Sequence, residues 1–161
     1  MEGKLVSQSQ VEMSQLMMPQ HANIAGTVYG GAILFIADSA AYVCAARHAG
    51  PRCVTVSIDQ VDFREPVQIG ELVTFKASVN YVGRTSMEIG IRIEAENLAT
   101  GNKRHTNSCY FTMVALDESR KPTPVPKLIC ETSVEKRRFK EGQIRREHAK
   151  ELAEKRNKAG L

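Results

Sequence analysis

Residues 30–46 read GGAILFIADSAAYVCAA, and this stretch decides the fold. It is rich in Ala and other apolar residues and contains no proline, and its glycines stand only at its start, so its composition favours a helix over Ala32–His48. Gly50-Pro51 then ends the helix. Because apolar residues lie around most of its circumference, the predicted helix must be covered on several sides.

Strand patterns fill the region that follows the helix. From Cys53 to Ala115, apolar side chains alternate with polar ones in runs separated by turn signals such as Val82-Gly83-Arg84. Such alternation is typical of an antiparallel sheet with one buried face. A change of parity at Val61 and Phe63 predicts a bulge or a bend. With a short strand over residues 11–18, we predict an α+β fold in which one curved antiparallel sheet wraps a long helix. An edge-to-edge dimer would cover the sheet edges.

The composition excludes several classes of protein. Of the 161 residues, 42% are hydrophobic and 25% are charged, which is ordinary for a soluble domain. Asp38 interrupts the longest apolar stretch and the N-terminus lacks a signal-peptide pattern, so we expect no membrane insertion and a cytoplasmic location. The four cysteines form no C-x-x-C pair and the histidines have no metal-ligand spacing. We therefore expect buried free thiols and no metal site.

The positive charge is concentrated in the last part of the chain. Residues 133–161 contain 10 Lys and Arg against 5 Asp and Glu. We predict one domain over residues 8–130 and a basic helical extension over residues 131–161, which begins with a capping box at Thr132-Ser133-Val134-Glu135. The extension is either a solvated surface helix docked by a narrow apolar stripe or a cationic surface for phosphates or nucleic acid.

Asp38 is the anomalous residue of the predicted helix. On helical spacing its neighbours, Leu34 and Ala41 among them, are small or apolar, and an unpaired carboxylate there would lose hydration. It is either a core aspartate bonded to a backbone or hydroxyl donor, or a functional group.

Two features before the helix complete a candidate site. Gly30-Gly31 is either a tight turn or an oxyanion hole, because the first N–H groups of a helix lack partners and favour negative charge. Asn23 lies in the preceding loop, where an amide either forms a turn or orients a water or a carbonyl.

These residues together resemble the acyl-CoA thioesterases of the hotdog superfamily. The resemblance begins with His21-Ala22-Asn23-x-x-Gly26-x-x-x-Gly30-Gly31 followed by Asp38, and it continues through Gly83-Arg84-Thr85-Ser86. The tail, from Pro124 to Gly142, is similar to that of the brain-type long-chain acyl-CoA hydrolase and its single-domain bacterial relatives. The resemblance implies the hotdog fold, a dimer whose sheets join edge to edge, and commonly a hexamer arranged as a trimer of dimers.

The resemblance also implies the chemistry, which is hydrolysis of fatty acyl-CoA to a free fatty acid and CoA. Asp38 would act as general base on water or, alternatively, as nucleophile, with Asn23 supplied by the opposite chain. Gly30 and Gly31 would hold the oxyanion. Arg84, Thr85 and Ser86 would contact CoA, with the basic stretch 137–146 as a second candidate for its phosphates. CoA is part of the substrate and product, so no separate cofactor is expected.

Two other functions remain open at this stage. A hydroxyacyl dehydratase on the same fold would need a histidine, and His21 is the only one near the loop. A non-catalytic acyl-CoA-binding regulator would use the basic tail on nucleic acid, but no helix-turn-helix pattern precedes the domain. We therefore expect acyl-CoA and further copies of this chain as partners, and no nucleic acid.

Overall fold

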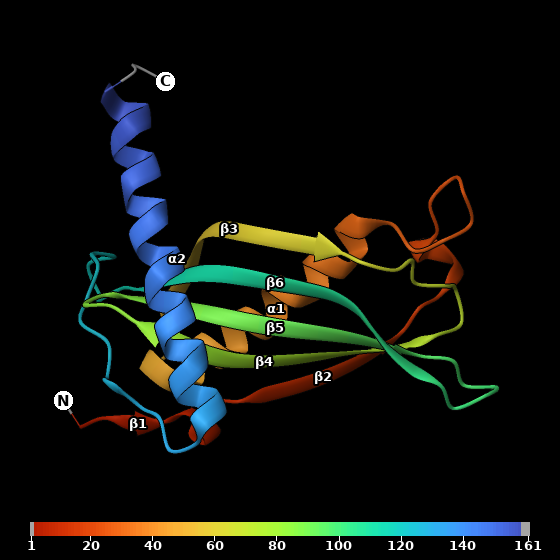
Figure 1. Ribbon diagram of the computed structural model, residues 1–161, viewed down its shortest axis with the longest axis horizontal. Coiled ribbons are helices and arrows are strands. Elements are labelled where there is room, and N and C mark those ends of the chain that lie inside the picture. Colours follow the sequence, from red (N-terminus) through yellow and green to blue (C-terminus); the bar gives the residue numbers. More distant parts are fainter. Residues whose placement is uncertain (1, 159–161) are drawn as a thin grey trace.

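The computed structural model describes residues 2–158, and a five-stranded antiparallel sheet forms its centre (Figure 1). The strand order is β2-β4-β5-β6-β3. The elements are β1 (Lys4–Leu5), η1 (Val6–Gln8), β2 (Val11–Leu16), η2 (Pro19–His21), α1 (Gly30–Ala49), β3 (Cys53–Phe63), β4 (Leu72–Val82), β5 (Ser86–Glu96), β6 (Lys103–Ala115), β7 (Leu128–Ile129) and α2 (Ser133–Lys158). The short strands β1 and β7 form a separate parallel pair. The predicted α+β architecture of one long helix against one antiparallel sheet is confirmed.

Helix α1 packs along one face of the sheet. Its alanines Ala37, Ala40 and Ala41 are fully buried, and these small side chains let the helix lie close to the strands. The face of β6 that points toward the core contributes the buried side chains of Cys109, Phe111 and Met113, as the alternating pattern predicted. Among the described residues, α1 is the one helix long and apolar enough to cross a membrane; its packing in the core accounts for that composition.

All five strands of the sheet contact α1, as the predicted wrapping of the helix requires. In the single chain one side of α1 still stays uncovered, where Phe35 is 77% exposed and Tyr42 is exposed as well. The edge strand β3 also exposes apolar side chains. We call the exposed apolar residues of α1 and of this edge together the α1–β3 apolar surface: Phe35, Tyr42, Val56, Ile58 and Phe63. Long apolar edge strands pair readily with another chain.

Two irregularities interrupt the pairing of β3 with β6. They lie between Thr55 and Ser57 and between Ile58 and Gln60. The predicted bulge is therefore confirmed, although it begins several residues before the change of parity at Val61. The extra residues bend the strand at the edge of the sheet.

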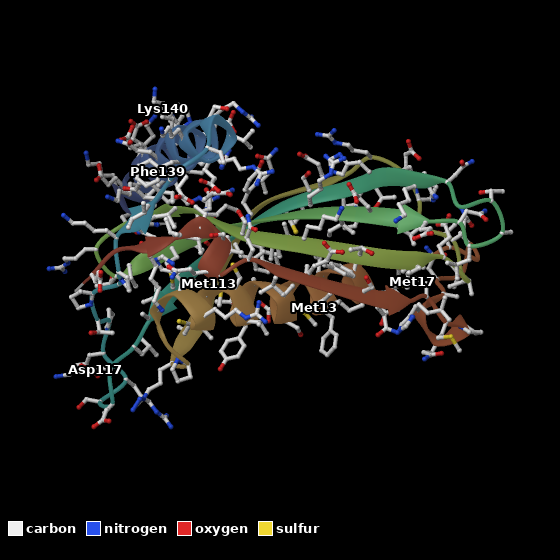
Figure 2. The ribbon with its side chains drawn as sticks, turned by 90° about the horizontal axis from the view of Figure 1, so that it is seen from below. Met13, Met17, Met113, Asp117, Phe139 and Lys140 are labelled. Atoms are coloured by element: carbon white, nitrogen blue, oxygen red, sulfur yellow. The ribbon has the colours of Figure 1, made fainter. Side chains whose placement is uncertain are left out.

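Helix α2 crosses the other face of the sheet (Figure 2). The predicted capping box is present: the Thr132 hydroxyl accepts a bond from the Glu135 N–H at 3.2 Å, and a Glu135 carboxylate oxygen accepts one from the Thr132 N–H at 3.0 Å. The helix docks through Phe139, whose ring centroid lies 5.0 Å from that of Tyr81, and through Gly142, where a Cβ would come within 2.8 Å of Tyr81.

Beyond this narrow contact, α2 projects past the β3 edge (Figure 1). As predicted, α2 is a surface helix with a narrow docking contact, but most of the apolar side chains expected to form the stripe, such as Ile144 and Leu152, are exposed. The division into residues 8–130 and 131–161 stays a prediction, and residues 159–161 of the extension lie outside the described residues.

Candidate active site

Asp38 lies on the exposed side of α1, beside the edge strand. The Thr55 hydroxyl on β3 donates a hydrogen bond of 2.6 Å to Asp38 Oδ1. The predicted burial among apolar neighbours is not what the single chain shows, because Asp38 is exposed although it bonds to the edge strand β3. Asp38 instead lies beside the α1–β3 apolar surface, where a covering molecule would remove it from water.

Asn23 holds together the loop that precedes α1. Its Oδ1 accepts bonds from the N–H groups of Ala25, at 2.9 Å, and Thr27, at 3.2 Å, and its Nδ2 donates to the Thr27 hydroxyl at 3.0 Å. The residue is exposed. Within one chain, Asn23 therefore has the turn role that sequence reasoning left open, and it lies at the surface where a second chain could reach it.

Gly30 and Gly31 form the first turn of α1, where N–H groups have no acceptor within the helix. The Phe63 ring packs against Gly30, because a Cβ on Gly30 would lie 3.0 Å from the ring. The residue before the helix, Tyr29, makes no side-chain cap bond to this end. The turn thus offers donors and the positive end of a helix dipole beside the end of β3.

The predicted CoA-contacting residues lie at the opposite end of the sheet in the same chain. Ser86 pairs with Val114, near the start of β3, whereas Gly30 touches Phe63 at the end of β3. The 11 residues of β3 separate these ends by ~30 Å. One chain therefore does not bring Arg84 and the first turn of α1 together. Arg84 is exposed and Thr85 is half-buried, while Ser86 is buried.

Comparison with known proteins decides the family. The sequence pattern described as Thioesterase superfamily matches residues 25–101. A crystal structure of an apo hexameric acyl-CoA thioesterase is 37% identical, with a TM-score of 0.91, and the match covers 95% of this chain and 98% of that one. The chain belongs to the thioesterase superfamily. It is an acyl-CoA thioester hydrolase with the hotdog fold, as the sequence predicted.

Two further relatives carry the same activity in their names. The acyl-CoA hydrolase of Staphylococcus aureus, solved with butyryl-CoA, CoA and CoA disulfide, is 31% identical with a TM-score of 0.90, over 97% of this chain and 95% of that one. Alanine variants of an asparagine, an aspartate and a threonine of that enzyme have also been solved. The cytosolic acyl-CoA thioester hydrolase of Rattus norvegicus is 34% identical over 146 residues, which cover 89% of this chain and 38% of that protein.

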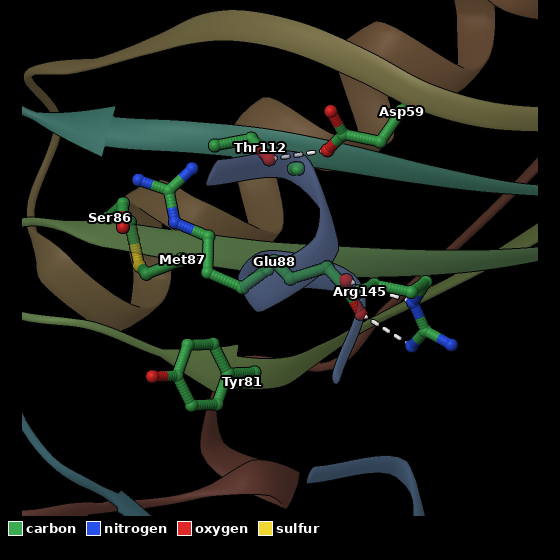
Figure 3. A pocket seen from close by; sticks show the side chains of 9 residues that line it. Asp59, Tyr81, Ser86, Met87, Glu88, Thr112 and Arg145 are labelled. Carbon is green, nitrogen blue, oxygen red and sulfur yellow. Dashed lines mark hydrogen bonds and ion pairs between the residues drawn. The ribbon is translucent and has the colours of Figure 1, made fainter. Parts of the chain in front are cut away.

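The space beneath α2 offers the thioesterase little room for a substrate (Figure 3). This cavity holds only about 10 Å³, and Ser86 lies in its lining. A partly buried ion pair between Arg145 and Glu88, at 2.7 Å, helps to close it, and the Arg145 guanidinium lies 3.9 Å above the Tyr110 ring. Arg137 is likewise paired, with Glu141 at 2.8 Å. Two arginines of the stretch 137–146 are thus engaged within the chain.

The thiols of this thioesterase are unsuited to nucleophilic attack. Cys44, Cys53 and Cys109 are buried free cysteines, as predicted, and Cys130 is partly exposed. Burial raises the pKa of the Cys44 thiol and that of the Cys109 thiol to about 12, so both stay protonated near neutral pH. Among residues 2–158, no cluster of three or more His, Cys, Asp and Glu side chains is arranged to hold a metal ion.

His21 is held by a local bond rather than aimed at a substrate. Its Nδ1 accepts a bond of 3.0 Å from the Met18 N–H. This contact ties the ring to the loop that it belongs to. The dehydratase alternative therefore gains no support from the geometry.

Thr55 is the site residue that sequence reasoning missed. In the sequence it is one polar position of an alternating strand, and nothing in the alternation separates it from Ser57. Only the packing of β3 beside α1 shows that the Thr55 hydroxyl meets Asp38. Asp38 on the helix and a hydroxyl on the following strand can be recognised as parts of one site only once the two elements are known to be neighbours.

Proposed function

We propose that this thioesterase hydrolyses fatty acyl-CoA to a free fatty acid and CoA at a site built from two copies of the chain, with Asp38 as general base. The observation that carries the proposal is the bond of 2.6 Å from Thr55 to Asp38 on an exposed apolar surface. A bare carboxylate with one oriented oxygen is suited to accept a proton from water. An apolar surface around it becomes a water-poor site once a second chain covers it.

The partner we propose is a second copy that pairs along β3. Within the α1–β3 apolar surface, Val56 is 61% exposed and lies on the unpaired edge strand β3. Pairing with a second chain would remove both the exposed apolar side chain and the unpaired edge. A two-fold axis makes the paired strands antiparallel, so the start of β3 in one chain lies beside the end of β3 in the other. This arrangement brings the Arg84 turn of one chain toward Gly30 and Gly31 of the other. A trimer of such dimers is our inference from the hexameric relative.

Each residue then has a defined task in hydrolysis. Asp38 removes a proton from water as the water oxygen attacks the thioester carbon, and Asn23 of the partner subunit orients that water or the carbonyl. The N–H of Gly31, with that of Gly30, stabilises the oxyanion. The tetrahedral intermediate then expels the CoA thiolate, which is a good leaving group. Thr55 holds Oδ1 of Asp38 and leaves the other oxygen free for the water.

The spacing of three residues supports this assignment. In the S. aureus hydrolase, the replaced asparagine, aspartate and threonine are separated by fifteen and then seventeen residues. Asn23, Asp38 and Thr55 have the same two separations in this chain. The nucleophile alternative for Asp38 uses the same geometry, with a mixed anhydride as the intermediate.

Recognition of CoA is assigned to the β4–β5 turn. Arg84 is the exposed cation there, and Thr85 and Ser86 add hydroxyl groups, so we propose that this turn contacts the pantetheine or the phosphates. The stretch 137–146 is the weaker candidate, because two of its arginines are paired within the chain. We propose no cofactor besides the CoA of the substrate. A cytoplasmic location is our inference from the cytosolic relative.

Thr55→Val tests the proposal, because valine keeps the shape of threonine but has no hydroxyl. We expect kcat for a fatty acyl-CoA to fall by about 10-fold with little change in KM, since the lost bond orients a catalytic group rather than the substrate. Released CoA thiol measures the rate.

Ser57→Ala is the matched control, because Ser57 lies on the same strand but bonds to Asp59. We expect this variant to keep the wild-type rate. Equal rates for the Thr55 variant and the wild type would refute the positioning role, and a wild-type protein that releases no thiol from any fatty acyl-CoA would refute the proposed function.

A further inference from the structure

The loop that carries Asn23 has little packing of its own. Residues 22–26 are all exposed, and Ile24 is open to solvent over its whole side chain. Hydrogen bonds shape the loop instead: the Asn23 N–H donates to the Thr27 carbonyl at 2.7 Å, and Asn23 Nδ2 donates to the Thr27 hydroxyl at 3.0 Å. Because these bonds tie Asn23 to Thr27, the place of Asn23 depends on what holds Thr27.

Thr27 and its neighbour Val28 are attached to a segment that precedes β4. Thr27 forms an antiparallel bridge with Gln68, and the Val28 N–H donates to the Val67 carbonyl at 2.9 Å. We call residues 66–68 the supporting segment. It lies between β3 and β4 and belongs to neither strand, so the hydrogen bonds of the five-stranded sheet do not fix it.

Glu71 and Arg104 hold the supporting segment at both of its ends. The Gln68 N–H donates to Glu71 Oε2 at 2.8 Å, and Arg104 Nη2 donates to the Pro66 carbonyl at 2.7 Å. The two side chains are also joined to each other, since Nη1 and Nη2 of Arg104 donate to the two oxygens of the Glu71 carboxylate. Arg104 reaches the neighbouring Glu65 as well, at 3.0 Å.

The Glu71–Arg104 ion pair is better suited to fixing geometry than to adding stability. Glu71 is 5% exposed, and hydrogen bonding to the Arg104 guanidinium holds the pKa of the Glu71 carboxyl below its ordinary value. Desolvation of a buried charge offsets much of its attraction to a partner, so such pairs contribute little net stability. A forked contact between a guanidinium and a carboxylate nevertheless fixes the direction of both groups.

We propose that Glu71 and Arg104 are positioning residues, which hold Asn23 where it meets Asp38 of the partner subunit. The inference rests on the proposed function. The ion pair acts on Asn23 through the supporting segment and Thr27. Its loss displaces Asn23 but leaves Asp38 of the same chain in place, because Thr55 holds that carboxylate.

Glu71→Gln tests the ion pair, because glutamine keeps the size of the side chain but turns one acceptor into a donor that faces Arg104. We expect kcat for a fatty acyl-CoA to fall by about 10-fold with little change in KM, since a misplaced catalytic group slows the reaction more than it weakens binding. Glu94→Gln is the matched control: Glu94 is also held by cations, Lys76 and Arg92, but its printed bonds lie outside the supporting segment. It should keep the wild-type kcat.

Subunit mixing separates a positioning role from a general loss of structure. In a mixed dimer of Glu71→Gln and Asp38→Ala chains, the second chain supplies an undisturbed Asn23 and the first supplies Asp38. We therefore expect captured mixed dimers to hydrolyse acyl-CoA at about half the wild-type rate, from one intact site of two. A mixed dimer of Glu71→Gln and Asn23→Ala chains contains only the displaced Asn23, so we expect about a twentieth of the wild-type rate.

Arg104→Lys keeps the charge but loses the fork, and it carries the same test if Glu71→Gln does not fold. It should show a lower kcat and the same recovery with Asp38→Ala alone. A wild-type kcat in the Glu71 and Arg104 variants, or no recovery with Asp38→Ala, would overturn the inference while the proposed function stands, provided that Asn23→Ala and Asp38→Ala chains restore each other. If that reference pair does not recover, the shared site of the proposed function fails, and the inference fails with it.

Discussion

Asp38→Ala is expected to lower kcat for acyl-CoA hydrolysis by at least about 100-fold, on the scale usual for a general base. The side chain lies on the exposed side of α1, and its bond in the described structure is the one from Thr55. Its removal therefore leaves the core intact, because the buried face of the helix consists of other residues, such as Ala37, Ala41 and Cys44. Loss of the carboxylate removes the group that accepts the proton of water.

The measurement is release of CoA thiol, with sedimentation and a thermal melt to show that the variant is folded and associated. Asp62→Ala is the matched control, because Asp62 is a carboxylate on β3 that bonds to Gln60 rather than to Thr55. We expect the control to hydrolyse acyl-CoA at close to the wild-type rate. A fully active Asp38→Ala protein would show that the mechanism is assigned to the wrong residue.

Val56→Asp is expected to give a monomer that hydrolyses acyl-CoA at least about 100-fold more slowly than the wild type. Val56 is 61% exposed within the α1–β3 apolar surface, on the unpaired edge of the sheet. A charge at this position would be buried without a partner when two chains pair, which opposes association. Because Asn23 and Asp38 are proposed to come from different chains, loss of pairing also dismantles the site.

Sedimentation velocity and thiol release measure the two effects on the same preparation. Val134→Asp is the control, because Val134 is also exposed but lies at the start of α2, outside the α1–β3 apolar surface. It should leave both the oligomer and the rate unchanged. A Val56→Asp protein that remains associated and active would place the interface elsewhere.

Local patterns were sufficient to predict most of the fold. The helix around Asp38, the alternating strands and the capping box at Thr132 each depend on neighbours in sequence, and the structure has all three. The side of α1 that stays uncovered in the single chain could not be predicted in this way. The exposure of Phe35 and Tyr42 depends on how strands distant in the sequence pack against the helix.

The candidate site was predicted only in part, for a similar reason. Asp38 can be found in the sequence because it interrupts an apolar helix. Gly30-Gly31 can be found because it directly precedes that helix. Thr55 looks like an ordinary polar position of a strand, and its role appears only when β3 lies beside α1. Long-range proximity of this kind is not encoded in local spacing.

Mixing Asn23→Ala and Asp38→Ala proteins tests the shared site most directly. Each variant alone should be nearly inactive, but a dimer with one chain of each kind contains one site with both residues intact. After subunit exchange at equal concentrations, half of the dimers are mixed, so we predict recovery of about a quarter of the wild-type rate of thiol release. Exchange is verified by affinity capture of a tag on one variant. If the captured mixed dimers hydrolyse acyl-CoA no faster than the parent variants, the two residues do not meet across the interface.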